Sequence, residues 1–212
     1  MPVKWLFYWQ PNVGSQVSSQ TLNDVFKRID SLHATKSTRW QITASQYRPN
    51  VRDQALPVDC ARELLGVTFT EAPDKIFFVL RQEHMVVEAD ATMQAIMERL
   101  QVYRNRLTVL FEGFQYELGD FRVKAGRAVL APVENLRGII MEVEYMPVSS
   151  LEQSRAAVLE FMELWQEGVI LGQFVPLELN FTDFSLSDHY CWQHTALQYV
   201  SLMAFFLSQQ RT

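Results

Sequence analysis

Two glutamates stand two residues apart in the otherwise apolar run "GIIMEVEYMP", Gly138 to Pro147. Because successive side chains of a strand point to opposite faces, Glu142 and Glu144 would share one face. Carboxylates at this spacing can hold a divalent metal inside a barrel-shaped phosphohydrolase. They are also typical of the solvated face of a half-buried antiparallel strand. The pair therefore indicates either metal chemistry or an ordinary strand.

A metal-dependent triphosphate hydrolase needs more than one pair. Several strands must each supply carboxylates for the metal, and inward lysines and arginines must bind the phosphates. The other predicted strands are poor in acids, since "VKWLFYWQ" and "KIFFVLRQ" contain none. We therefore expect Glu142 and Glu144 to be solvated, and we expect folding to survive their joint replacement by glutamine. A hydrolase that uses this pair is kept as the alternative function.

The stretch "HYCWQH" places Cys191 and His194 three residues apart. On a helix these two side chains could face the same way and supply two metal ligands. No third and fourth ligand cluster is visible, so ordinary packing or surface positions are expected for the four histidines, His33, His84, His189 and His194. The two cysteines, Cys60 and Cys191, form no CxxC pair, which favours a reducing compartment.

The remaining chemical signals are weak. Arg122, Lys124 and Arg127 lie near a predicted hairpin turn at Gly126, where they could touch phosphate, but a charged turn is usually solvated. No glycine-rich nucleotide loop and no G-x-S-x-G motif is present, and Ser15 is expected to be a loop serine. No cofactor is predicted.

Composition favours a folded, acidic protein. Of the 212 residues, 48% are hydrophobic and 12% aromatic, which is too apolar for a disordered chain. The formal net charge of -5 argues against direct binding to nucleic acid, although a local basic patch stays open. The longest late apolar run, "ALQYVSLMAFFL", is shorter than the roughly 20 residues that a membrane span needs. The prediction is an intracellular protein without membrane attachment.

The apolar periodicity predicts strands early in the chain and through its middle, with helices near both ends. A long loop is expected over residues 49–62, and the clearest helix begins at Ser150, where Gln153 completes a capping box. The order of these elements indicates an α+β fold, a curved antiparallel β-barrel of about eight strands with packed helices. We expect a single domain over residues 1–212.

The last predicted helix, from about Asp188 to Leu207, is apolar on most of its circumference. Such a helix must be buried on two sides, either inside its own fold or against a partner, because a surface helix needs only one apolar stripe. Both alternatives stay open. Excess apolarity suggests the following partner-facing groups: Trp5, Phe7 and Trp9 on one face of the first strand, and Phe205 and Phe206 at the end of the last helix.

Four segments together resemble the family of subunit 20 of the Mediator complex: "FQYELGDFRVKAGRAVL", "RGIIMEVEYMP", "LEFMELW" and "LQYVSLM". The resemblance is strongest from about Phe111 to Trp165, and none of these motifs is catalytic. It implies a curved barrel similar in architecture to tunnel-shaped RNA triphosphatases, but without enzymatic activity. Glu142 and Glu144 fall inside the resembling stretch, which favours a structural role for them.

The resemblance also implies a place in the cell. It points to a structural subunit of the Mediator head module, in the nucleus, that couples transcription regulators to RNA polymerase II by protein–protein contacts. The expected partners are Mediator subunit 18, as a heterodimer, the C-terminal region of Mediator subunit 8, other head-module subunits and, indirectly, the polymerase machinery. A free-standing nucleotide- or RNA-binding barrel is disfavoured by the charge and by the lack of a basic aromatic surface.

Overall fold

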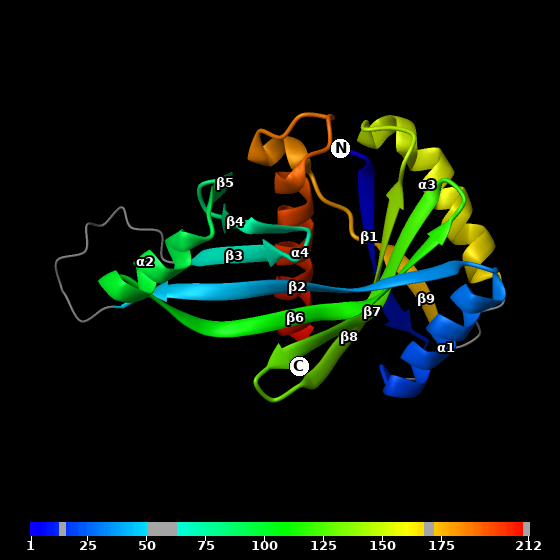
Figure 1. Cartoon of the computed structure of the whole chain (residues 1–212), viewed down its shortest axis with the longest axis horizontal. Helices are drawn as coiled ribbons and strands as arrows, with labels where there is room; N and C mark the ends of the chain where they lie inside the picture. The colour runs from blue at the N-terminus through cyan, green and yellow to red at the C-terminus, as the bar shows by residue number, and fades with distance from the viewer. Residues whose placement is uncertain (13–15, 51–62, 168–171, 210–212) are drawn as a thin grey trace.

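The computed structural model describes residues 1–12, 16–50, 63–167 and 172–209. In that part of the chain a single nine-stranded antiparallel sheet runs in the order β5-β4-β3-β2-β6-β7-β8-β1-β9, and it is curved and twisted (Figure 1). The strands are β1 Val3–Pro11, β2 Thr35–Pro49, β3 Leu64–Phe69, β4 Ala72–Leu80, β5 Met85–Asp90, β6 Tyr103–Leu118, β7 Phe121–Ala131, β8 Asn135–Tyr145 and β9 Gly172–Pro176. The helices are α1 Ser19–Ser31, α2 Thr92–Leu100, α3 Leu151–Gln166 and α4 Trp192–Ser208, with a short 3-10 helix, η1, at Phe181–Phe184.

The predicted α+β class and the curved antiparallel sheet are confirmed. The curved sheet does not close on itself, since the edge strands β5 and β9 each pair on one side only and not with each other. The expected loop over 49–62 and its Cys60 fall almost wholly on residues 51–62, outside the described residues, and so does Ser15. Because the sheet is curved, it has a concave and a convex face, and different helices cover each face.

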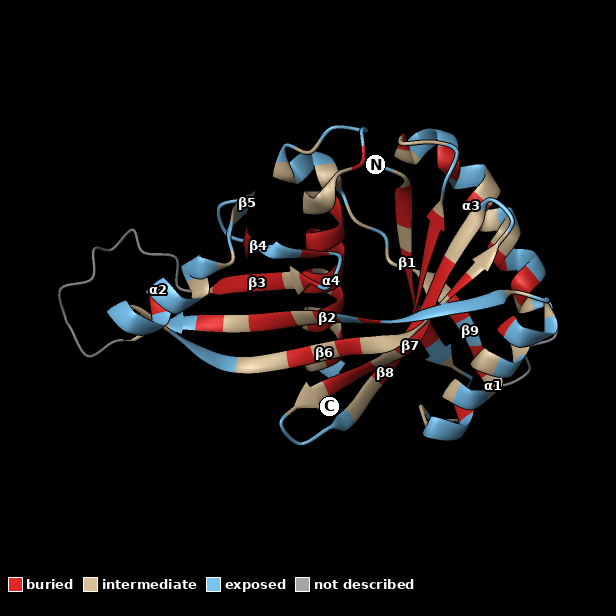
Figure 2. Cartoon of the chain, in the orientation of Figure 1, coloured by how far each residue is buried: buried red, intermediate tan, exposed pale blue. Residues whose placement is uncertain are grey.

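Helix α4 lies against the concave face, where Figure 1 shows it crossing behind the strands. Ten of its residues are buried, and it contacts β1 to β5 and β8. The all-round apolarity of this helix is thus explained by burial within its own chain. Figure 2 shows the corresponding band of buried positions along α4 and the strands in front of it. No helix of the described residues is long and apolar enough to span a membrane.

The convex face carries the other three helices. Helices α1 and α3 pack over β1, β7, β8 and β9 around a second apolar cluster, which includes Phe7, Trp9, Met141 and Trp165. Both helices begin at serines that cap them, because the Ser18 and Ser150 hydroxyls accept hydrogen bonds from the backbone N–H groups of Thr21 and Gln153. The capping role predicted for Ser150 is confirmed. Helix α2 covers a smaller cluster near β3 and β4.

Two glycines pair with each other in the middle of the β6–β7 ladder. Gly113 pairs with Gly126 in the register of these strands. A Cβ atom at Gly126 would lie 2.2 Å from the carbonyl oxygen of Glu112, and one at Gly113 would lie 2.0 Å from that of Ala125. The predicted turn at Gly126 is therefore wrong: the glycine lies inside β7, where it permits close approach of two backbones.

We expect Gly126→Ala to destabilise the protein by about 3 kcal/mol or more, because the new methyl group would force β6 and β7 apart. Urea denaturation followed by circular dichroism measures the loss. Gly119→Ala is the matched control: it places a residue at a positive φ of 57°, with nothing within 4 Å, and should cost about 1 kcal/mol. Equal losses in the two variants would contradict the close approach of the two backbones.

Candidate functional site

The two glutamates of the opening motif lie on the concave face of β8 and are buried. Glu142 is 1% exposed and Glu144 is 5% exposed. The predicted solvated strand face is therefore wrong, and with it the reason for expecting folding to survive the joint replacement of these two residues by glutamine. The alternation itself is as expected, since Ile140 shares their face and packs in the core beneath α4, whereas Ile139 and Met141 face the opposite cluster. What the alternation did not reveal is that α4 covers the face.

Glu142 is the centre of an ionic cluster. Lys124 lies opposite it on β7, with 3.2 Å between the Lys124 Nζ and Glu142 Oε1 atoms. Lys4, on β1, places its Nζ 3.6 Å from the same oxygen. The second oxygen, Oε2, accepts a hydrogen bond of 2.8 Å from the hydroxyl of Tyr199 on α4. Both lysines are only 2% exposed, so water cannot solvate their ammonium groups. The negative charge of the Glu142 carboxylate compensates for this lost solvation.

Glu71 completes the cluster from the turn between β3 and β4. Its Oε2 atom lies 3.2 Å from the Lys4 Nζ atom, and its Oε1 atom contacts the Lys124 ammonium group. The strands β3 and β4 are separated from β7 by β2 and β6 in the sheet order, so this contact reaches across the concave face. We call Lys4, Glu71, Lys124 and Glu142 the inner quartet; its formal charges sum to zero.

A second row of charges lies beside the inner quartet. Arg122 on β7 donates from Nη1 to Glu144 Oε2 and from Nε to Glu117 Oε1, each at 3.0 Å. In the strand register Glu117 pairs with Arg122, Arg122 with Glu144 and Glu144 with Lys4. Charges of opposite sign thus alternate across β6, β7, β8 and β1, the arrangement that cross-strand pairing favours.

The pKa values of these groups follow from burial and charge. Burial alone would raise the pKa of Glu142, but Lys124 and Lys4 overcome it and lower that pKa to about 2. The pKa of Glu71 is likewise lowered by the two lysines against the effect of burial. Burial opposes the charge of Lys4, yet Glu142, Glu144 and Glu71 raise its pKa. Burial, with the negative charge of Glu142, raises the pKa of Tyr199 well above its usual value, so its phenol stays a donor.

This arrangement is suited to holding strands together and poorly suited to binding a cation. Oε1 of Glu142 faces two ammonium groups and Oε2 accepts the Tyr199 hydroxyl, so a metal ion would have to displace two lysines. Among the described residues no group of three histidine, cysteine or acidic side chains is placed to hold a metal ion. Arg122 and Lys124, predicted to be solvated, are instead ion-paired, and Lys124 is buried.

Cys191 and His194 do come together, as the helical spacing predicts, with 3.1 Å between Sγ and Nδ1. Cys191 is the N-cap of α4, and its backbone N–H donates to His194 Nδ1, while Nε2 lies 2.9 Å from the carbonyl oxygen of Ser187. His194 is fully buried, and burial lowers its pKa. The pair acts as a helix cap, consistent with the packing role expected for the histidine.

The five side chains predicted to face a partner lie in different environments. Phe7, Trp9 and Phe206 are buried in the two main clusters of this chain, which accounts for their apolarity without a partner. Trp5 and Phe205 are half-buried. Trp5 donates from Nε1 to Ser154 Oγ, and Phe205 packs against Tyr8 at 4.5 Å between ring centroids. Contact with a partner stays a prediction for this set.

Sequence reasoning missed Lys4, Glu71 and Tyr199 as members of the cluster. Lys4 carried a usable signal, because a lysine inside the apolar run "VKWLF" must find a counter-charge if that strand is covered on both faces. Glu71 and Tyr199 carried none. They lie far from Glu142 in sequence, and only the curvature of the sheet and the position of α4 bring them to it.

Comparison with known proteins identifies close relatives. A family model described as "TATA-binding related factor (TRF) of subunit 20 of Mediator complex" matches residues 1–204. Mediator of RNA polymerase II transcription subunit 20b of Arabidopsis thaliana is 47% identical over 208 residues, which cover 96% of this chain and 95% of that protein. Mediator subunit 20 of Xenopus laevis is 23% identical over 196 residues, 91% of this chain and 89% of that protein.

Two solved structures are similar at a lower level. A chain of the Schizosaccharomyces pombe Mediator head module is 14% identical, with a TM-score of 0.46, covering 82% of this chain and 99% of that one. The putative adenylyl cyclase HpAC1 from Hippeastrum, described as having a dominant triphosphatase activity, is 11% identical, with a TM-score of 0.45, covering 90% of this chain and 100% of that one.

We expect Glu142→Gln to destabilise the protein by about 3 kcal/mol, since it leaves two buried ammonium groups with one carboxylate. Glu144→Gln should cost about 1 kcal/mol, because its partner Arg122 is partly exposed. Urea denaturation of both variants measures the difference. The double variant Glu142→Gln with Lys124→Met removes one charge of each sign and should lose less than the single variant. A larger loss would contradict the charge balance of the inner quartet.

Stability should fall steeply in acid. The folded-state pKa of Glu142 lies below the ordinary value of 4.5, at about 2. A depressed carboxyl pKa stabilises the fold above the unfolded-state value, and this contribution disappears as the pH falls from about 4.5 to about 2. Urea midpoints measured from pH 6 to pH 2 test this. The Glu142→Gln variant should show a shallower decline, and an unchanged slope would assign the acid sensitivity to other groups.

Proposed function

Because the chain belongs to the family of subunit 20 of the Mediator complex, we propose that it is a non-enzymatic structural subunit of the Mediator head module. In this role it couples transcription regulators to RNA polymerase II through protein–protein contacts. The observation that carries the proposal is the match along almost the whole chain, over residues 1–204 to the family and over 208 residues to a relative that is 47% identical. We also propose a nuclear location, which membership of a transcription complex supports.

The interior of the molecule supports a structural role. A hydrolase of the tunnel type needs an open, charged interior that admits a polyphosphate and its metal. Here α4 fills the concave face with apolar side chains, and the buried carboxylate Glu142 is paired with lysines of the same chain. The charges are thus satisfied internally, which favours assembly through the outer surface over chemistry inside the sheet.

The proposed partners are Mediator subunit 18, as a heterodimer, and the C-terminal region of Mediator subunit 8, which would join this pair to the rest of the head module. Of the apolar side chains that the sequence assigns to a partner contact, Trp5 and Phe205 keep part of their surface exposed. We assign them to that contact. Trp5 borders a hollow of about 630 Å³ together with Arg155, whose guanidinium carbon lies 5.7 Å from the centroid of the Trp5 ring.

Co-expression with a Mediator subunit 18 homologue, followed by size-exclusion chromatography with light scattering, should give a 1:1 complex. Replacement of Trp5 or Phe205 by serine should weaken that complex while leaving the circular dichroism spectrum of the isolated chain unchanged. A monomer that ignores the homologue would contradict the proposed heterodimer. Release of phosphate from tripolyphosphate in the presence of Mg²⁺ or Mn²⁺, lost in Glu142→Gln, would contradict the non-enzymatic role and support the hydrolase alternative.

A further inference from the structure

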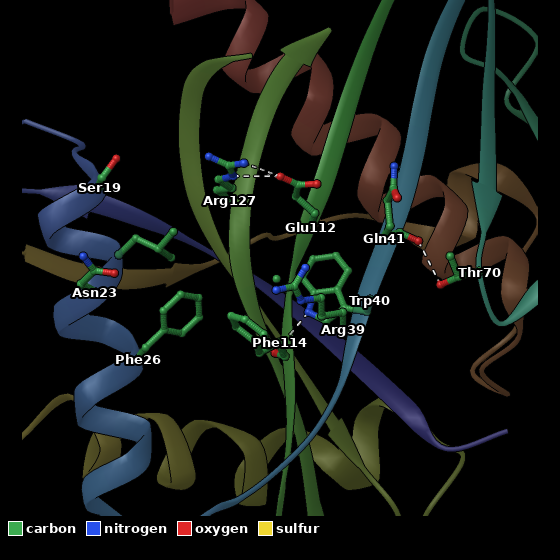
Figure 3. Close-up of a pocket in the computed structure, with 12 residues that line it drawn as sticks. Ser19, Asn23, Phe26, Arg39, Trp40, Gln41, Thr70, Glu112, Phe114 and Arg127 are labelled. Carbon is green, nitrogen blue, oxygen red and sulfur yellow. Dashed lines mark hydrogen bonds and ion pairs between the residues drawn. The ribbon is translucent and has the colours of Figure 1, made fainter. Parts of the chain in front are cut away.

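A hollow of about 610 Å³ lies on the convex side of the molecule, between the start of α1 and the strands β2, β6 and β7 (Figure 3). Helix α1 forms one wall with Leu22, Asn23 and Phe26. The strands form the floor. This volume is within the range of binding pockets that accept a few side chains or a small ligand. None of the described contacts of the inner quartet involves this hollow, so it is separate from the buried site.

The register of the strands places charged and aromatic groups side by side on the floor. Arg39 on β2 lies opposite Phe114 on β6, and Glu112 on β6 lies opposite Arg127 on β7. Phe26 of α1 meets Phe114 edge-on, with 5.5 Å between ring centroids. Figure 3 shows the Phe26 and Phe114 side chains near each other, with the Arg127 and Glu112 pair above them. The floor thus offers an aromatic surface bordered by two guanidinium groups.

Positive charge is in excess at this hollow. The Lys36 Nζ atom lies 3.4 Å from the centroid of the Phe114 ring, and the Arg39 guanidinium carbon lies 5.6 Å from it. Among the ion pairs of the described residues, Lys36 and Arg39 have no carboxylate partner, whereas Arg127 is paired with Glu112 at 2.6 Å. Arg39 and Arg127 line the hollow together with one anion, Glu112, and Lys36 adds a third positive charge against the Phe114 ring, on a chain whose formal net charge is -5. Two exposed cations that share one ring repel each other, so an anionic ligand would be favoured here.

We propose that this hollow binds a short acidic segment of a partner protein. A carboxylate of the segment would pair with Lys36 and Arg39, and a neighbouring apolar side chain would pack on Phe26 and Phe114. The positive charges of Lys36 and Arg39 favour an acidic residue in the segment, and the rings of Phe26 and Phe114 favour an apolar residue next to it. A phosphate backbone is disfavoured, because the net negative charge of the chain repels a long polyanion but tolerates a local one.

This inference goes beyond membership of the head module, since the hollow is formed by this chain alone. It can therefore fail while the heterodimer with Mediator subunit 18 forms, or hold while that heterodimer does not. The two proposals are separated by using the isolated full-length chain for peptide binding and the co-expressed chains for assembly.

The test is fluorescence anisotropy of a labelled twelve-residue peptide in which aspartate and glutamate alternate with phenylalanine and leucine. The double variant Lys36→Gln with Arg39→Gln should bind it at least about tenfold more weakly, and wild-type affinity should fall as salt is raised. Arg104→Gln with Arg106→Gln is the matched control, because it removes two exposed cations from the other end of β6. It should change the affinity less than about twofold.

Three outcomes would overturn the proposal. A peptide with asparagine and glutamine in place of the acids that binds equally well would make the contact purely apolar. Equal weakening in the Arg104 and Arg106 variant would make the attraction non-specific. Tighter binding of a single-stranded oligonucleotide that depends on Lys36 and Arg39 would assign the hollow to nucleic acid.

Discussion

Two buried lysines impose the strictest condition on this fold. An ammonium group taken out of water is costly unless a carboxylate stands beside it. Lys4 and Lys124 satisfy this condition only through Glu142 and Glu71, which come from different parts of the sheet. The sheet must therefore curve until the turn between β3 and β4 reaches β1 and β7. The curvature of the sheet therefore both pairs these four charges and sets the positions of the helices on its two faces.

Helix α4 completes this arrangement and decides what kind of protein results. Its Tyr199 bonds to Glu142, and its Gln198 donates from Nε2 to the backbone oxygen of Lys4 at 3.1 Å. An apolar helix thus occupies the concave face and leaves the polar groups there with partners in the same chain. The charges on this face are paired within the chain, and apolar side chains of α4 fill the space beside them. This is why we propose recognition on the outer face, where the hollow beside α1 has an aromatic floor.

The sequence was sufficient for the local elements and insufficient for what covers them. Alternation correctly predicted which residues of β8 share a face, and the Ser150 capping motif correctly predicted the start of α3. Neither pattern indicates whether a strand face is exposed to solvent or covered by another element. The exposure predicted for Glu142 is therefore wrong, because helix α4, some fifty residues later in the chain, covers it. The turn predicted at Gly126 is wrong for a related reason. A single sequence does not distinguish a glycine in a turn from a glycine inside a strand whose neighbouring backbone leaves no room for a side chain.

The position of β1 has a consequence for the order of folding. The first strand of the chain lies between β8 and β9, so its neighbours are residues 140–145 and 172–176. During synthesis on the ribosome, the pairing of Val3–Pro11 has to follow the synthesis of residues 140–145 and 172–176. Pairings of such long sequence separation slow folding and expose apolar strands in the meantime. The ionic interior thus joins Lys4 to groups that lie more than sixty residues away in sequence, and it cannot form before Glu142 has been synthesised.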